Sequence, residues 1–386
     1  MNISKKTIKL AILFYSLVQI GAICITSILG RIAELFPEYS TTTIQFLATC
    51  PSVMIIFVSL LTGKLAEHIA KKYLALFSAS MFIVSAFGGF LFHTSFPLLF
   101  LWQIILGIGI GILVPLGSAL IADYFTGEER SGLMGLQSAI ISVGGVLLSL
   151  LAGLLASIEW YYNYLALLLI VPGFLLLVFG LPLDHPKPLG HSREERVRVI
   201  PKIVLFYGIT AFLFMLFYNV ISTNLAIHLK ENEIIGSVFS GIATSVFMLS
   251  GAVAGILFKQ LKRLLGERVI AYGFFNLALG GVILGLFVSY PILLIGAFIA
   301  GFSLSIVMAQ VVISIAEKEK PEAVTMSIAI NMAINNLGAF LSPSFTKVSK
   351  LILHGERAAD RYLLVGGAAM VAAIVLFVVL GKEKKR

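Results

Sequence analysis

Residues 73–122 read YLALFSASMFIVSAFGGFLFHTSFPLLFLWQIILGIGIGILVPLGSALIA, and none of these fifty residues is charged. A membrane-spanning helix needs about 20 consecutive apolar residues, so this stretch is long enough for two. The segment His93-Thr94-Ser95-Phe96-Pro97 lies near its middle. Because proline can begin a helix but cannot continue one, the stretch predicts two membrane helices separated by a turn before Pro97.

The rest of the sequence has the same character. Of 386 residues, 59% are hydrophobic and 12% charged, whereas soluble domains carry roughly 25% charged residues. Nine further uncharged intervals cover residues 10–30, 39–63, 131–158, 160–183, 203–229, 234–258, 269–316, 323–346 and 362–381. The interval 269–316 is also long enough for two spans and contains Ser289-Tyr290-Pro291. We therefore predict an all-α membrane protein with 12 transmembrane helices, which excludes a soluble enzyme.

The basic residues predict the orientation of these helices. With the N-terminus in the cytoplasm, 22 of the 28 Lys and Arg residues fall in cytoplasmic segments, as the positive-inside rule requires. The six in outer segments are Arg31, Lys230, Lys347, Lys350, Arg357 and Arg361. We expect a multi-pass protein of the inner (plasma) membrane with both termini cytoplasmic. Topology then explains the net charge of +9, so no nucleic-acid partner is expected.

The chain repeats itself at half its length. Leu13-Phe14-Tyr15 recurs as Leu205-Phe206-Tyr207, and Gly144 corresponds to Gly338, at separations of 192 and 194 residues. The repeat predicts two six-helix bundles, residues 1–183 and 203–386, joined by a cytoplasmic linker at 184–202. Six helices are an even number, so both bundles enter the membrane in the same direction.

The segment Gly63-Lys64-Leu65-Ala66-Glu67-His68-Ile69-Ala70-Lys71-Lys72 resembles the signature loop between helices 2 and 3 of the major facilitator superfamily. Glycine, leucine, an acid and a basic pair are in register. Glu67 replaces the usual aspartate, and His68 and Ala70 replace an arginine and a glycine. The resemblance, to compact drug and metabolite exporters in particular, implies a secondary transporter that works by alternating access.

The same resemblance implies a charged latch that holds the two bundles together when the cytoplasmic side is closed. In it, Glu67 meets the inner end of helix 11, with Asp123 and Arg130 joining the cluster. The alternative is that these are loop charges that only set topology. The candidate latch residues are Gly63, Glu67, Lys71, Asp123 and Arg130.

The predicted spans carry no Asp, Glu, Lys or Arg near their middle. A charge there costs at least ~2.5 kcal/mol and usually marks an ion or proton pathway, so we expect a pathway built from neutral polar groups. Some of these groups could instead be hydrogen-bonding contacts between helices. The candidate substrate-binding residues are Tyr15, Gln19, Gln45, Thr49, Gln103, Tyr207, Tyr218, Asn219, Gln310, Asn331 and Asn335. Proton-driven exporters of the resembled superfamily usually carry an arginine at the position of Gln103, so we expect any proton coupling to be weak, peripheral or supplied by the substrate's own proton.

We expect efflux of a small neutral or amphipathic organic molecule. One alternative is uptake or exchange of an organic anion, and another is a membrane receptor or sensor that keeps a transporter fold without transporting. An enzyme is not expected, because the spans contain no metal-ligand cluster or nucleophile–base pair. Gly107-Ile108-Gly109-Ile110-Gly111 lacks the preceding strand and following Lys-Ser/Thr of a phosphate loop. No cofactor or metal is expected, the lipid bilayer and a small-molecule substrate are the expected partners, and the chain is expected to be a monomer.

Overall fold

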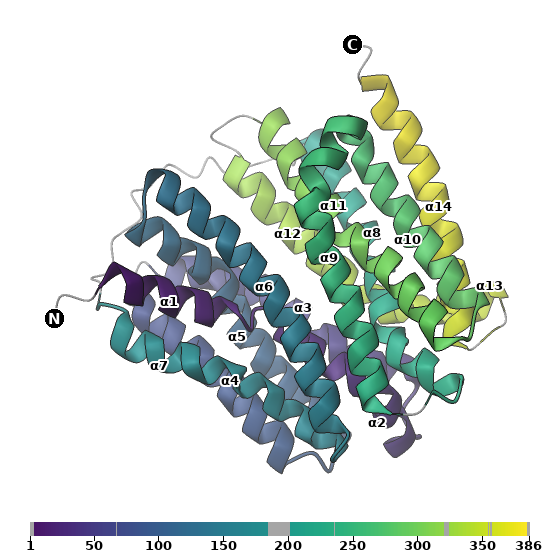
Figure 1. Cartoon of the computed structure of the whole chain (residues 1–386), viewed down its shortest axis with the longest axis horizontal. Helices are drawn as coiled ribbons and strands as arrows, with labels where there is room; N and C mark the ends of the chain where they lie inside the picture. Colours follow the sequence, from purple (N-terminus) through teal and green to yellow (C-terminus); the bar gives the residue numbers. More distant parts are fainter. Residues whose placement is uncertain are drawn as a thin grey trace. The chain divides into compact units, whose positions relative to one another are not determined.

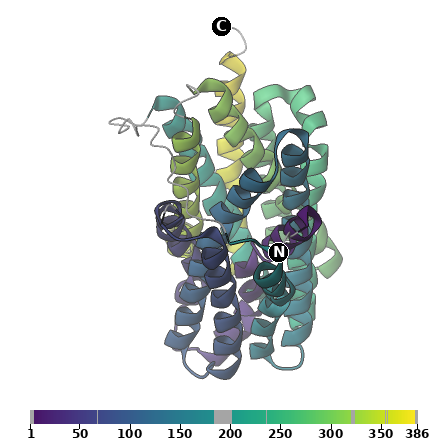
Figure 2. The same ribbon diagram turned by 90° about the vertical axis from the view of Figure 1, so that its left-hand side faces the viewer.

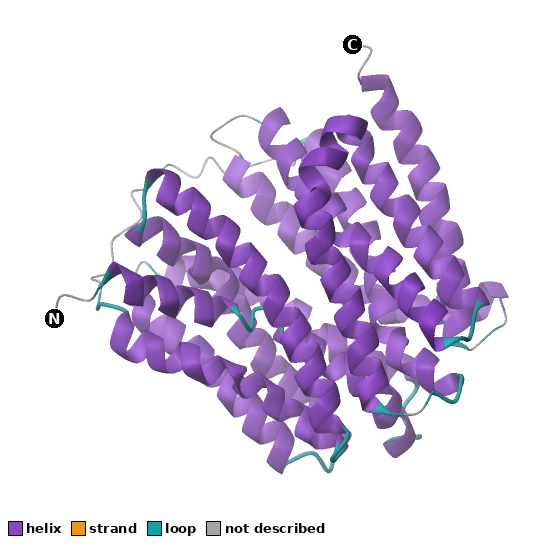
Figure 3. Cartoon of the chain, in the orientation of Figure 1, coloured by secondary structure: helices purple, strands orange, loops and turns teal. Residues whose placement is uncertain are grey.

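The computed structural model describes residues 4–66, 68–183, 201–234, 236–319, 324–353, 355 and 357–383. Glu67 and most of the predicted linker, residues 184–200, lie outside the described residues. Within them, every segment of regular structure is helical (Figure 3). The α-helices are α1 Lys5–Ser16, α2 Leu29–Leu35, α3 Thr41–Leu65, α4 Lys71–Leu91, α5 Phe96–Tyr124, α6 Gly127–Ala156, α7 Val171–Gly180, α8 Lys202–Glu231, α9 Ser237–Leu265, α10 Val269–Leu286, α11 Tyr290–Lys318, α12 Val324–Leu341, α13 Phe345–Leu353 and α14 Ala358–Glu383. The 3-10 helices are η1 Gly21–Ile28, η2 Trp160–Ile170, η3 Gly266–Arg268 and η4 Ser342–Ser344.

The helices follow the predicted spans. Ten described segments are long and apolar enough to cross a membrane, and one of them, Ser237–Leu286, contains both α9 and α10. The predicted span 323–346 corresponds to α12 and η4. Both predicted turns are present, because α5 begins at Phe96 with Pro97 in its first turn, and α11 begins at Tyr290 with Pro291 in its first turn. The predicted all-helical membrane fold is confirmed.

The first span differs from the continuous α-helix that the sequence predicts. Its α-helix ends at Ser16, and the chain continues through a turn into η1 before α2. The backbone amides of Gln19 and Gly21 donate to the carbonyls three residues earlier, the tighter pattern of a 3-10 turn. Ser16 Oγ donates to the Ile12 carbonyl at 2.9 Å, a bond that often bends helices. Tyr15 and Gln19 therefore do not share one α-helical face.

The chain forms two compact units. Unit 1 comprises Met1–Ile25 and Cys50–Arg198, and unit 2 comprises Thr26–Thr49 and Val199–Arg386, so the boundary crosses α3. In unit 2 the long helices, coloured green to yellow, lie alongside one another, with α10 next to both α11 and α14 (Figure 1, Figure 2).

Each unit contains a close helix crossing at an equivalent glycine. A Cβ atom added to Gly144 on α6 would lie 1.8 Å from the carbonyl oxygen of Leu17, at the end of α1. One added to Gly338 on α12 would lie 2.3 Å from the carbonyl oxygen of Phe212 on α8. Only glycine lets the two backbones approach this closely. Gly144 and Gly338 are 194 residues apart, so the sequence repeat reappears as a repeated packing contact.

A second pair of contacts repeats in the same way. In unit 1, Ser59 Oγ on α3 donates to the Gly111 carbonyl on α5 at 3.0 Å. In unit 2, Ser305 Oγ on α11 donates to the Gly251 carbonyl on α9 at 2.7 Å. Gly111 and Ser305 are 194 residues apart, and Ser59 and Gly251 are 192 apart. In unit 1 the serine is on α3 and the glycine on α5, whereas in unit 2 the serine is on α11 and the glycine on α9. The contact therefore joins the equivalent pair of helices in each unit, with donor and acceptor exchanged.

Candidate functional site

Unit 1 holds three of the candidate substrate-binding residues. Tyr15 on α1 and Gln103 on α5 are buried, whereas Gln19, in the turn after α1, is half-buried. Gln103 lies beside the hydroxyl of Tyr164 on η2. The arrangement places an amide and two phenols inside the unit, with no charged side chain among the three.

In unit 2, the C-terminal end of α8 carries a buried polar cluster that joins three helices. Gln45 Nε2 on α3 donates to Asn224 Oδ1 on α8 at 2.6 Å. Arg361 Nη1 on α14 donates to the same oxygen at 2.5 Å. All three residues are at most 2% exposed. Of these, only Gln45 belongs to the predicted substrate-binding set.

Arg361 corrects one part of the sequence interpretation. Its position before the uncharged interval 362–381 places it among the outer loop charges, yet the structure buries it in the first turn of α14, 2% exposed. The helix begins at Ala358, four residues before that interval, and so takes the arginine with it. Unit 2 therefore contains a buried cation that counting of charges did not find.

The N-terminal end of α8 carries a second cluster. Lys318 Nζ, at the end of α11, donates to the Tyr207 hydroxyl and to Glu267 Oε2, each at 2.9 Å. The ammonium also lies 5.4 Å from the centre of the Tyr207 ring. Tyr207 and Asn224 are 17 residues apart on α8, ~26 Å along its axis at 1.5 Å per residue. Polar clusters thus lie toward opposite ends of this helix.

The side chains of α8 between these two clusters are uncharged, and several of them are aromatic. The Tyr218 ring packs against Phe247, with ring centres 4.6 Å apart, and Asn219 Nδ2 donates to the Met215 carbonyl on its own helix. Thr49 Oγ1 on α3 is 3.4 Å from the Phe340 carbonyl on α12.

Three amides on α11 and α12 complete the predicted set. Gln310 on α11 is buried and donates from Nε2 to Ser314 Oγ at 2.9 Å, while its Oε1 has no partner among the described residues. Asn331 on α12 is 2% exposed, and within the described part of the chain its Nδ2 also has none. Asn335 is half-buried, with Nδ2 3.8 Å from Met308 Sδ on α11. These three residues share the α11 and α12 region of unit 2.

Two of the latch candidates meet in unit 1. Lys71, the first residue of α4, forms an ion pair with Asp123 at the end of α5. Arg130, in the first turn of α6, and Gly63, near the end of α3, are both exposed. Lys72 donates from Nζ to the carbonyls of Val178 and Leu181 at 2.7 Å each. The two adjacent lysines therefore have different partners, a carboxylate for Lys71 and backbone carbonyls for Lys72.

The sequence interpretation missed Asn224, Arg361 and Lys318. Asn224 is a neutral polar residue within the predicted seventh span, 203–229, so its residue type and position were sufficient to include it. Both cations lie at helix ends: Arg361 directly precedes the uncharged interval 362–381, and Lys318 is two residues after the interval 269–316. Extending the predicted helices by one turn at each end brings both cations into the helical segments.

Comparison with known proteins agrees with these observations. A family model described as Major Facilitator Superfamily matches residues 8–232 and again 207–386. Protein TsgA of Salmonella newport (strain SL254) and of Salmonella typhi are each 25% identical over 211 residues. These alignments cover 53% of this chain, and the chain spans about half the length of those relatives, 53% in each case.

Solved structures share the fold over nearly the whole chain. A D-xylose-proton symporter matches with a TM-score of 0.73 at 17% identity, covering 96% of this chain and 97% of that one. A bacterial homologue of the human lysosomal transporter Spinster matches with a TM-score of 0.74 at 16% identity, covering 97% and 96%. A POT family transporter matches with a TM-score of 0.76 at 12% identity, covering 98% and 96%. The chain belongs to the Major Facilitator Superfamily and is a multi-pass membrane protein with the fold of these transporters.

Proposed function

We propose that the protein exports a small neutral or amphipathic organic molecule across the plasma membrane by alternating access. The observation that carries this proposal is the neutrality of the buried polar groups. Among the described residues, the buried polar side chains are amides and hydroxyls, apart from Arg361 and His228. Amides and hydroxyls both donate and accept hydrogen bonds, which suits the hydroxyl, carbonyl and amide groups of uncharged cargo.

Gln310 and Asn331 are among the buried amides that have a polar atom in need of a partner. Gln310 Oε1 and Asn331 Nδ2 are buried without a hydrogen bond from any described residue. A buried polar atom left unpaired costs about 1–3 kcal/mol, so such atoms call for an explanation. We propose that substrate or bound water supplies the missing bonds at these two positions.

The direction of transport rests on similarity to compact, short-looped exporters. The distribution of Lys and Arg supports a cytoplasmic location for both termini. Efflux from the cytoplasm and insertion in the plasma membrane are therefore parts of the proposal, together with a monomeric state.

A thermal-stability screen of the purified full chain against metabolites and drugs tests the proposal. A ligand raises the midpoint of unfolding of the form that binds it. A neutral compound that stabilises the wild type is expected to lose most of this effect with Asn331→Ala. Asn336→Ala is the matched control, because Asn336 is on the same helix and, among the described residues, donates to the Met332 carbonyl one turn earlier and to no other group. An unchanged shift with Asn331→Ala would remove that residue from the site.

Counterflow in proteoliposomes then separates transport from binding. Vesicles loaded with the stabilising compound are expected to accumulate its labelled form faster than empty vesicles. Stabilisation without counterflow would instead support a receptor or sensor that keeps the fold.

The response to a pH gradient tests coupling. No Asp or Glu is among the buried side chains of the described residues, and such groups usually form proton pathways in membranes. We expect an imposed gradient to change the initial rate of transport of a neutral cargo by less than about twofold. Because about 1.4 kcal/mol corresponds to a tenfold change, a twofold change is a small energetic effect. A steep dependence on the gradient would contradict an uncoupled carrier.

Uptake or exchange of an organic anion is the second candidate function, and buried Arg361 favours it. Guanidinium binds carboxylates in bidentate geometry, and this one is 2% exposed. If the cargo is an anion, carboxylates in the screen should stabilise the wild type, and Arg361→Gln should abolish that stabilisation. Stabilisation by neutral compounds alone would leave the first candidate.

A further inference from the structure

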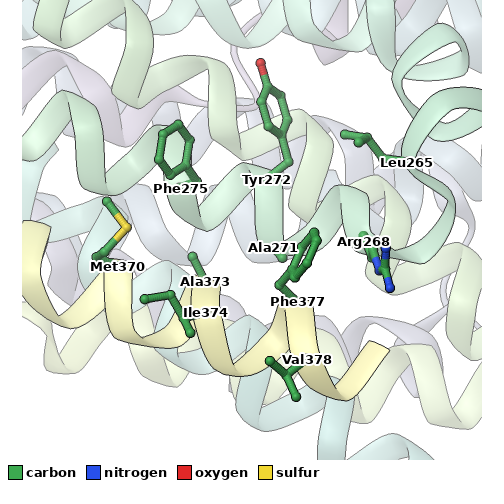
Figure 4. A pocket seen from close by; sticks show the side chains of 10 residues that line it. All are labelled: Leu265, Arg268, Ala271, Tyr272, Phe275, Met370, Ala373, Ile374, Phe377 and Val378. Carbon is green, nitrogen blue, oxygen red and sulfur yellow. The ribbon is translucent and has the colours of Figure 1, made fainter. Parts of the chain in front are cut away.

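A groove of about 330 Å³ lies between α10 and α14 in unit 2. Apart from the hydroxyl of Tyr272, its lining is apolar except at one end, where Arg268 lies (Figure 4). The lining residues are Leu265, Arg268, Ala271, Tyr272, Phe275, Met370, Ala373, Ile374, Phe377 and Val378. Gln310, Asn331 and the cluster at Asn224 do not line it, so the groove is separate from the residues proposed to bind cargo.

Small residues form the groove, and large exposed ones form its walls. Ala271 and Ala373 are buried, at 3% and 6% exposure. Around them, Phe275, Ile374 and Phe377 are 41%, 58% and 50% exposed. Apolar side chains exposed in this way on a membrane helix face hydrocarbon rather than water. The groove therefore opens to a lipid environment.

The length of the groove matches one leaflet of a bilayer. Met370 and Val378 lie eight residues apart on α14, about 12 Å at 1.5 Å per residue. Half of a hydrocarbon core about 30 Å thick is about 15 Å. Arg268 lies beyond the apolar lining, since a Cβ added to Gly381 would be 2.4 Å from its Nη2 atom. The guanidinium is thus placed at the depth expected for a lipid headgroup.

The charge of Arg268 is not neutralised by the residues that the structure describes. Its guanidinium carbon lies 4.6 Å from the centre of the Phe377 ring, and no described carboxylate lies within 4.0 Å of its nitrogens. The adjacent Glu267 is paired with Lys318 at 2.9 Å. A guanidinium with free donors favours a phosphate, which it can bind in bidentate geometry.

We propose that this groove binds an anionic phospholipid, with one acyl chain between α10 and α14 and the phosphate on Arg268. The lipid belongs to the leaflet on the side of the C-terminus of α14. Anionic lipids gather in the cytoplasmic leaflet, and basic pockets between membrane helices bind their headgroups. The site would make the protein's stability depend on the lipid composition of the membrane.

Native mass spectrometry of the full chain, titrated with dioleoyl-phosphatidylglycerol or dioleoyl-phosphatidylcholine, tests this site. The wild type is expected to bind the first lipid about fivefold more tightly, as one basic residue near the surface supplies about that factor. Arg268→Gln should reduce the preference to nearly one. Arg263→Gln is the matched control, because Arg263 is exposed at the end of α9 and does not line the groove.

Ala373→Phe tests the acyl chain independently of the headgroup. The added ring fills the groove, so one fewer tightly bound lipid is expected for both lipids. If Ala373→Phe does not fold, as judged by size-exclusion chromatography, the two arginine variants decide. An undiminished preference with Arg268→Gln, or equal binding of the two lipids by the wild type, overturns the proposal. A lipid-free dimer of the wild type would also overturn it, since the groove would then be covered by a second copy.

Discussion

Asn224 shows how one neutral residue can hold a buried charge in unit 2. Its Oδ1 accepts from Gln45 and from Arg361, and its own Nδ2 donates to the Val220 carbonyl at 2.7 Å. Hydrogen bonds to charged groups are worth more than those between neutral groups. A single amide therefore couples α3, α8 and α14 without adding a second charge.

Replacing Asn224 with Leu is expected to lower the free energy of unfolding by about 1–3 kcal/mol, because a buried cation and a buried amide both lose this acceptor. Asn224→Asp should be less destabilising than Asn224→Leu, since a carboxylate can accept from both donors although it loses the bond to the Val220 carbonyl. Asn219→Leu is the control, because the hydrogen bonds of Asn219 to described residues stay within its own helix. Thermal unfolding of the three variants in detergent checks the order, and equal midpoints for Asn224→Leu and Asn219→Leu would show that the cluster contributes little.

At the scale of single helices, glycine at a crossing allows two backbones to lie close together. Gly144 and Gly338 each contact the backbone of a neighbouring helix, whereas among the described residues nothing lies within 4 Å of a Cβ placed at Gly135 on α6. The same residue type is thus required at some positions of a helix and replaceable at others.

Gly144→Ala and Gly338→Ala are expected to destabilise the protein by about 1–3 kcal/mol, the usual cost of overpacking. Gly135→Ala should be neutral or stabilising, by up to about 1 kcal/mol, because alanine is the better helix former. Fluorescence-detected size-exclusion chromatography after heating ranks the three variants. If both crossing variants behave like Gly135→Ala, the helices separate more easily than the contacts imply.

The helices themselves were largely predictable from the sequence, because they depend on local properties. Pro97 and Pro291 mark helix starts, and the uncharged intervals mark the spans. The break at Ser16 was not predictable, since it involves Gln137, whose Nε2 donates to Ser16 Oγ at 2.8 Å from a position 121 residues away. Asn224 is 137 residues from Arg361, and Tyr207 and Glu267 are 111 and 51 residues from Lys318. The site could therefore be predicted only as a set of residue types.

At the scale of the whole molecule, the repeated contacts account for the duplicated sequence. Equivalent glycines and serines join equivalent helices in each unit, at separations close to half the chain length. Selection for the same packing in both units would preserve these positions while the polar side chains between them diverge. This explains why Gly144 and Gly338 correspond, whereas Gln103 has no amide at the equivalent positions, Ile295 to Ala297.

The natural cysteines make the membrane topology testable. Cys24 and Cys50 are only 3% and 8% exposed, so a membrane-impermeant maleimide should label the wild type weakly. A single introduced cysteine can then be detected over a low background.

Four such variants test the orientation that the basic residues predict. Thr94→Cys and Val288→Cys are in connections expected outside the cell, and His68→Cys and Leu264→Cys are exposed at connections expected inside. We expect the first two to be labelled in intact cells and the other two only after permeabilisation, because the excess of Lys and Arg holds their connections in the cytoplasm. Each pair contains one residue from unit 1 and one from unit 2. Opposite accessibility within a pair would mean that the two repeats enter the membrane in opposite directions, which six helices per repeat do not allow.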